Sequence, residues 1–122
     1  FTLKNSELKE VLANSDFVSL HVPAQDKYLI GKKELGLMKP GSGIINTSRG
    51  GVLDEVALVE ALDSEHLAFA GLDVYESEPN PEIKILMNPK ISLSPHIGGS
   101  TLEAQERIGI ELADKVIKLL KK

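Results

Sequence analysis

The feature that most constrains the fold is the alternation of short apolar runs with segments of helical periodicity. The apolar runs have the length of strands, and they cover residues 17–22, 43–48, 68–75 and 91–94. Helices are predicted to begin near Leu8 and Lys32, after Asp54, which is a good N-cap, and from Thr101. Because runs that are apolar on both faces alternate with helices, the sequence predicts the α/β fold class, with a parallel sheet covered by helices on both faces.

Local signals predict the ends of these helices and the character of one long loop. Asn5 or Ser6 can cap the first helix, and Ser100 and Glu103 have the spacing of a capping box at the start of one long C-terminal helix. The segment between the third and fourth strands contains two prolines and is predicted to be a polar loop. The long helix has an apolar side that consists of Ile108, Leu112, Val116, Leu119 and Leu120.

Composition excludes several classes of function. The chain has 122 residues, which suits one small domain, and its net charge of −4 provides no basic face for nucleic acid. It has no cysteine, so it has neither disulfides nor thiolate chemistry, as expected of a cytoplasmic protein. No apolar run approaches the roughly 18 residues needed to span a bilayer, and no spacing of His and carboxylates is typical of a metal site.

Polar, cationic and glycine-rich residues concentrate directly after the predicted strands. Ligands of an open parallel sheet bind outside the carboxyl ends of its strands, so this distribution predicts an active site there. The phosphate-binding GxGxxG motif is missing: Gly41 and Gly43 come nearest, but Asn46 stands at the third glycine, and a strand follows where a helix should. A turn is the favoured interpretation of that segment. The residues alone therefore predict an α/β half-domain with a site, and they do not identify its cofactor.

Four segments resemble consecutive signatures of the D-isomer-specific 2-hydroxyacid dehydrogenases: DFVSLHVP, LMKPGSGIINTSRGGVLDEVALVEAL, AGLDVYESEP and SPHIGGSTLEAQERIG. The resemblance runs through essentially the whole chain, and PHIGGST with LEAQ is most similar to the phosphoglycerate dehydrogenase branch. It implies that residues 1–122 are the second half of a Rossmann-type, doubly wound NAD-binding domain, with about four strands, flanking helices and a long C-terminal helix. The GxGxxG half and the substrate domain would then lie outside this sequence, which also lacks an initiator Met.

The resemblance implies an enzyme that transfers a hydride between NAD and a D-2-hydroxy acid, with 3-phosphoglycerate as the expected substrate. NADP stays open, because the acidic residue that discriminates the two dinucleotides would lie upstream. The parent protein is expected to be a homodimer or a larger homo-oligomer. Two alternatives stay open as well: a dinucleotide-sensing scaffold that resembles the C-terminal-binding corepressors, and a fragment that is inactive on its own.

Three residues match the catalytic positions of the family. Arg49 matches the substrate-binding arginine, whose planar guanidinium grips a carboxylate at two points; a surface salt bridge is the alternative. His96 matches the general base that takes the hydroxyl proton as the hydride leaves. Glu78 matches the carboxylate that orients this imidazole, and the alternative is a solvated loop carboxylate. Glu76 is a competitor for the same role.

A second set of residues matches positions that contact the dinucleotide. Asp73 resembles the residue that bonds the nicotinamide carboxamide, although an Asp at a strand end can also cap a turn. Gly98 and Gly99 would permit close approach beside the nicotinamide. His66 has no partner motif and is predicted to be a surface or turn residue. The remaining cofactor contacts are predicted at His21, Pro23, Thr47, Ser48, Arg49 and His96.

Overall fold

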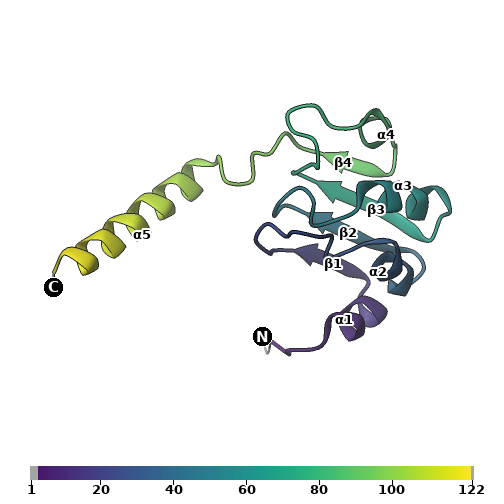
Figure 1. Ribbon diagram of the computed structural model, residues 1–122, viewed down its shortest axis with the longest axis horizontal. Helices are drawn as coiled ribbons and strands as arrows, with labels where there is room; N and C mark the ends of the chain where they lie inside the picture. Colours follow the sequence, from purple (N-terminus) through teal and green to yellow (C-terminus); the bar gives the residue numbers. More distant parts are fainter. Residues whose placement is uncertain (1–2, 122) are drawn as a thin grey trace.

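The computed structural model describes residues 3–121, and it contains one parallel sheet of four strands (Figure 1). The strands lie in the order β1-β2-β3-β4, so each one pairs with its neighbour in the sequence. This confirms the predicted α/β fold with four parallel strands. Their bounds are Phe17–Leu20 for β1, Ser42–Asn46 for β2, Leu67–Leu72 for β3 and Ile91–Leu93 for β4.

Five helices accompany the strands: α1 (Leu8–Asn14), α2 (Lys32–Leu37), α3 (Glu55–Asp63), α4 (Ile83–Leu86) and α5 (Leu102–Leu120). Helix α4 lies in the segment that was predicted to be a polar loop, so that prediction is wrong for these four residues. The reason is tertiary: a single turn is too short to show helical periodicity, and it buries Ile85 in the common core.

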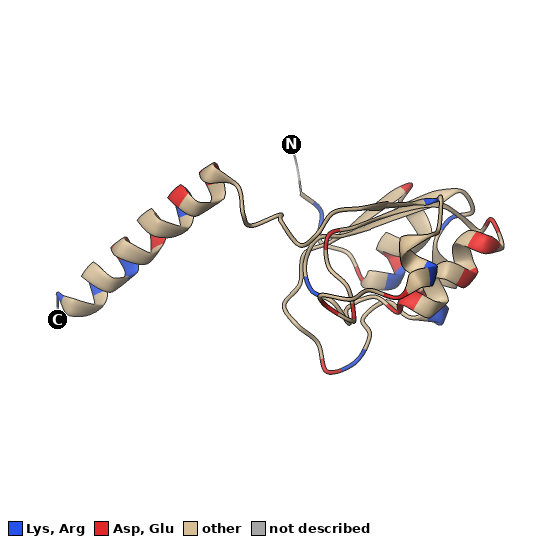
Figure 2. Ribbon diagram, turned by 90° about the horizontal axis from the view of Figure 1, so that it is seen from above, with Lys and Arg blue, Asp and Glu red and all other residues tan. Residues whose placement is uncertain are grey.

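Helices cover only one face of the sheet, which Figure 2 shows nearly edge-on. In β1 the exposed residues Phe17 and Ser19 alternate with buried Val18 and Leu20. The expectation of helices on both faces is therefore wrong for residues 3–121. On the open face the Phe17 and Phe69 rings pack together, with their centroids 5.9 Å apart.

The capping residues were predicted correctly for one helix and wrongly for two. Asp54 caps α3, since its Oδ1 accepts the Ala57 N–H at 3.0 Å. Helix α1 instead begins after Glu7, without a side-chain cap, so neither Asn5 nor Ser6 caps it. The cap of α5 is Thr101, whose hydroxyl accepts the Ala104 N–H at 3.1 Å, in place of Ser100.

Helix α5 extends away from the sheet (Figure 1), and none of its residues is buried. The apolar side that was predicted for this helix is present, but it is exposed, with Leu112 60% and Leu119 68% accessible. Among residues 3–121, no helix combines the length and the hydropathy that crossing a bilayer requires.

Candidate active site

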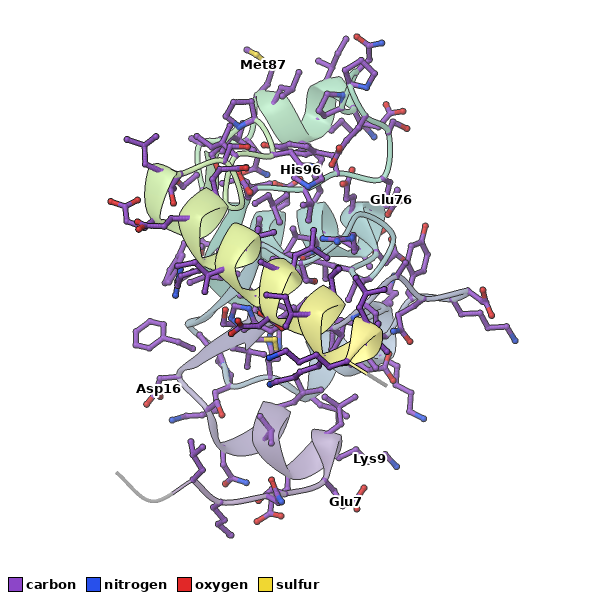
Figure 3. All side chains as sticks on the ribbon, turned by 90° about the vertical axis from the view of Figure 1, so that its left-hand side faces the viewer. Glu7, Lys9, Asp16, Glu76, Met87 and His96 are labelled. Atoms are coloured by element: carbon purple, nitrogen blue, oxygen red, sulfur yellow. The ribbon has the colours of Figure 1, made fainter. Side chains whose placement is uncertain are left out.

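The candidate site lies at the carboxyl ends of the four strands, where the strands end earlier than predicted. Strand β1 ends at Leu20, β2 at Asn46 and β3 at Leu72, so the polar residues that follow stand in loops. These loops lie side by side because the carboxyl ends of parallel strands all lie at the same edge of the sheet. Figure 3 looks onto this edge and shows His96 and Glu76 there, with α5 crossing in front.

His96 and Glu78 are in direct contact, as predicted. The Nδ1 of His96 lies 2.7 Å from Glu78 Oε2, while Glu78 Oε1 accepts the Tyr75 N–H at 2.9 Å. The hydrogen bond from His96, followed by that from Tyr75, lowers the pKa of Glu78. Because Nδ1 is engaged with the carboxylate, Nε2 is the ring nitrogen that remains available to a ligand, and 47% of the His96 side chain is exposed.

Asp73 holds the loop that carries His96. Its Oδ1 accepts hydrogen bonds from the Ser94 hydroxyl at 2.6 Å and the Ile97 N–H at 2.9 Å, and its Oδ2 accepts the Gly98 N–H at 2.8 Å. Burial by itself raises the pKa of Asp73, but these hydrogen bonds outweigh it, so the net pKa is lowered. An ionised Asp73 therefore fixes both sides of His96, which itself has a positive φ of 55°.

The loop that carries Arg49 is organised by a residue that the sequence-based interpretation did not assign to the site. Asn46 Oδ1 accepts the Ser48 N–H at 3.1 Å and the Ser48 hydroxyl at 2.8 Å, and its Nδ2 donates to the Arg49 carbonyl at 3.0 Å. Asn residues commonly bond their own backbone two residues on, and this tendency was the available signal. The loop thus has a fixed path around a buried amide.

Arg49 is exposed and free of carboxylates in the part of the chain that the structure describes. Its Nη1 donates to the carbonyl of Ser48 at 2.6 Å, and no acidic side chain among residues 3–121 lies within ion-pair distance of it. The surface salt bridge that was weighed as an alternative is therefore not found. Arg49, Glu78 and His96 line the same cavity, which has a volume of about 970 Å³.

The predicted dinucleotide contacts are distributed along the same edge. His21, Pro23 and Thr47 are exposed after β1 and β2, whereas Ser48 is buried. The Nε2 of His21 lies 2.8 Å from the Ser19 hydroxyl. The remaining residues of this set, Gly98 and Gly99, follow His96 in the loop after β4.

His66, which was predicted to be a turn residue, lies between α3 and β3, away from the cavity. It is half-buried, and its Nε2 donates to the carbonyl of Leu35 at 3.1 Å. Its own carbonyl accepts the Gly41 N–H at 2.8 Å. Both bonds join α2 and β2 to the start of β3, so the role of His66 is structural.

Glu76 does not bond His96, although it stands only two residues before Glu78. Its Oε1 accepts the N–H of Glu55 at 2.9 Å, and its Oε2 accepts the hydroxyl of Tyr28 at 2.9 Å. Of the two competing glutamates, the structure therefore places only Glu78 beside the imidazole. Tyr28 and Glu55 were not singled out from the sequence, because nothing local indicates that they meet Glu76.

Comparison with known proteins gives the family. The NAD-binding domain of the D-isomer specific 2-hydroxyacid dehydrogenases matches residues 1–98. D-3-phosphoglycerate dehydrogenase of Escherichia coli (strain K12) is 51% identical over 118 residues, which are 91% of this chain and 29% of that protein. A hydroxypyruvate reductase of Thermotoga maritima is 45% identical over 119 residues, or 93% of this chain and 39% of that protein.

The fold is shared with solved structures of the same family. The crystal structure of a glyoxylate reductase from Paecilomyes thermophila superposes with a TM-score of 0.85 at 42% identity, over 96% of this chain and 36% of that one. The chain thus spans about a third of the length of the proteins it resembles. Its sequence, its parallel sheet and its strand-end site together show that the chain belongs to the D-isomer specific 2-hydroxyacid dehydrogenases and corresponds to part of their NAD-binding domain.

Proposed function

We propose that this chain is the C-terminal half of the NAD-binding domain of a dehydrogenase that transfers a hydride between NAD and a D-2-hydroxy acid. The contact between His96 and Glu78, in a cavity that Arg49 also lines, is the observation that carries the proposal. It brings a proton acceptor and a carboxylate-binding cation to one cavity, and those are the two groups that oxidation of a hydroxy acid requires from the protein.

Arg49 binds the substrate carboxylate in this proposal. Its guanidinium is exposed in the cavity and makes no ion pair with a carboxylate of residues 3–121, so its charge is available to an anionic ligand. The Asn46 amide fixes the backbone on both sides of Ser48, and hence the point from which the Arg49 side chain leaves. A fixed fork of two N–H donors orients a carboxylate and the carbon next to it.

His96 accepts the hydroxyl proton at Nε2, because Nδ1 is directed to Glu78. The lowered pKa of Glu78 keeps this carboxylate ionised at neutral pH, so it stabilises the imidazolium that forms when the proton arrives. In the reverse direction the same nitrogen returns the proton to the alkoxide. Asp73 holds the His96 loop through three hydrogen bonds and so keeps the ring in position for both steps.

The residues at the strand ends fit a dinucleotide. His21, Pro23 and Thr47 are exposed in the loops after β1 and β2. The space beside Gly99 is open, since a Cβ added there would meet nothing within 4 Å. These positions, with Ser48 and Asp73, would hold the cofactor, and the bound dinucleotide would supply the hydride acceptor. NAD is proposed because the matching family model is an NAD-binding domain.

Within the family, 3-phosphoglycerate is the substrate that we propose. Support comes from the relatives named D-3-phosphoglycerate dehydrogenase, of which that of Escherichia coli (strain K12) is 51% identical over 118 residues. A relative named for 4-methyl-2-oxopentanoate reduction is 50% identical over a shorter stretch of 99 residues, and those named for hydroxypyruvate and glyoxylate reduction are 45% and 42% identical. A dinucleotide-sensing scaffold that resembles a corepressor stays the alternative proposal. Homo-oligomeric assembly of the longer protein and a cytoplasmic location stay predictions.

The test is the formation of NADH, followed by absorbance, by the longer protein that contains this segment. We expect NADH from 3-phosphoglycerate with NAD, and a loss of at least about a hundredfold in kcat for His96→Gln, since a positioned general base contributes that much or more. Oxidation of another D-2-hydroxy acid in its place would leave the reaction class standing and reject the substrate. No NADH from any D-2-hydroxy acid would reject the enzyme and favour the scaffold.

A further inference from the structure

We infer that Glu76 is a positioning residue that ties the loops after β1, β2 and β3 together and thereby sets where Arg49 stands relative to Glu78 and His96. The inference rests on the proposed function, which gives those three residues their roles. Glu76 takes no part in the proposed proton transfer, and its carboxylate is directed to Glu55 and Tyr28 and not to His96.

Two reciprocal hydrogen bonds join Glu76 to the first turn of α3. The Glu55 N–H donates to Glu76 Oε1 at 2.9 Å, and the Glu76 N–H donates to Glu55 Oε1 at 2.7 Å. Glu55 is only 6% exposed and Glu76 is exposed, so water is excluded from the Glu55 side of this pair of bonds. Glu55 follows Arg49 by six residues and Glu76 precedes Glu78 by two, so the pair connects the two loops that carry the site.

The other carboxylate oxygen of Glu76 reaches the loop after β1. Its Oε2 accepts the Tyr28 hydroxyl at 2.9 Å, and this bond raises the pKa of Tyr28, because ionisation of the hydroxyl would remove the donated proton. Tyr28 and Glu76 both line the cavity that contains Arg49 and His96. Because one oxygen accepts the Glu55 N–H and the other accepts the Tyr28 hydroxyl, the Glu76 carboxylate is held by protein donors and is not directed toward the substrate.

The loop after β2 and the loop after β3 are also in contact through their backbones. A Cβ built on Gly50 would lie 1.8 Å from the carbonyl oxygen of Tyr75, which is closer than any real contact. The backbone after Arg49 therefore lies directly on the backbone before Glu76. The contact at Gly50 sets the distance between the two loops, and the Glu55–Glu76 hydrogen bonds set their position along one another. A shift of one loop would therefore move Arg49 relative to Glu78.

Kinetics of the longer dehydrogenase test the inference. For Glu76→Ala we expect the KM for the hydroxy acid to rise roughly tenfold, because the two hydrogen bonds that the Glu76 carboxylate accepts are lost and only the bond from its backbone N–H remains, while the KM for NAD stays within about twofold. Glu76→Gln should restore most of the loss, since the glutamine carbonyl can accept the Glu55 N–H and its amide can donate to Tyr28. Tyr28→Phe, which removes one bond only, should raise the same KM by a smaller factor.

A matched control is available on α3 itself. Glu60 is exposed and pairs with Lys32 at 2.7 Å, away from the cavity. Glu60→Gln therefore changes a glutamate on the helix that contains Glu55 but leaves the contacts between the loops intact. We expect wild-type KM values for it. If Glu76→Ala lowered kcat alone, or raised both KM values equally, Glu76 would have only a general structural role and the inference would be overturned.

A second readout does not depend on activity. In amide NMR spectra of the 122-residue chain, Glu76→Ala should shift the signals of Gly50, Gly51 and Glu55, and Glu60→Gln should leave them unchanged. Unshifted signals would overturn the inference even if the longer protein is an active dehydrogenase. A longer protein that oxidises no D-2-hydroxy acid would reject the proposed function alone. If Glu76→Ala does not fold, Tyr28→Phe gives the same comparison at an exposed side chain.

Discussion

The Gly98 amide donates to Asp73 Oδ2 at 2.8 Å, and a Cβ added at Gly98 would lie only 2.9 Å from the same oxygen. A side chain at this position would force either the loop or the Asp73 carboxylate to shift. The contact holds the chain two residues after His96, while Ser94 bonds the other carboxylate oxygen two residues before it. Asp73 is thus the buried point around which the candidate general base is arranged.

Gly98→Ala should destabilise the chain by about 1–3 kcal/mol, because the added methyl group must displace either the loop or a buried carboxylate. Urea unfolding followed by circular dichroism measures the change. Gly99→Ala is the control: its Cβ meets nothing within 4 Å, so we expect a change within about 0.5 kcal/mol. Equal effects of the two substitutions would contradict the packing argument.

The contact between His96 and Glu78 predicts a pH dependence. The pKa of Glu78 lies below 4.5 in the folded chain, chiefly because His96 bonds its carboxylate. Ionised Glu78 therefore stabilises the fold above that ordinary value, and its contribution is lost as the pH falls through the lowered pKa. His96→Gln should move the pKa of Glu78 up toward 4.5 in carbon-detected NMR titrations, and His21→Gln should not. A Glu78 pKa that is the same in both variants would exclude the contact in solution.

Glu55 predicts the opposite dependence. Burial raises the pKa of Glu55 above 4.5, despite the hydrogen bond from the Glu76 N–H. The contribution of the protonated acid is fully present below the unfolded-state pKa and is lost as the pH rises through the raised folded-state value. Glu55→Gln keeps a carbonyl acceptor without the charge, so it should be more stable relative to wild type at about pH 7 than at about pH 4. Unfolding free energies at both pH values measure this, and a difference that is independent of pH would refute it.

The assignment of Arg49 predicts a change in substrate affinity. In the longer dehydrogenase, Arg49→Lys should raise the KM for the hydroxy acid roughly tenfold to a hundredfold, because one of two charge-assisted hydrogen bonds is lost. The KM for NAD should change far less. Arg107→Lys, on exposed helix α5, is the matched control. A wild-type KM for Arg49→Lys would remove this residue from the substrate site.

The 122-residue chain by itself should bind NAD negligibly. The pyrophosphate of a dinucleotide normally sits on a glycine-rich turn at a helix N-terminus, and the sequence contains no GxGxxG motif. Calorimetric titration of NAD into the chain should show no binding up to millimolar concentrations, and lengthening the chain by the upstream half-domain should restore it. Micromolar binding to the chain alone would mean that its four strand ends make a complete site.

Much of the fold was predictable because the signals are local. Each signal arises within a few residues: the apolar runs of strand length, Asp54 as an N-cap, and the helical spacing of apolar residues in α5. These signals predicted four strands and four of the five helices. Helix α4 and the cap at Thr101 were missed, since a single turn and a choice between adjacent hydroxyl residues depend on what the chain packs against. The open face of the sheet was missed for the same reason: apolar runs indicate burial and do not indicate which neighbour provides it.

The sequence by itself determined that polar and glycine-rich residues follow the strands, and its family signatures predicted Arg49, Glu78 and His96 as the catalytic residues. Only the tertiary structure decided which of two nearby glutamates meets the imidazole. Glu76 and Glu78 have the same carboxylate, and their roles differ because donors from distant segments, the Glu55 N–H and the Tyr28 hydroxyl, satisfy one of them and leave the other to His96. Those donors are 21 and 48 residues from Glu76 along the chain, and the parallel sheet alone brings them to one edge.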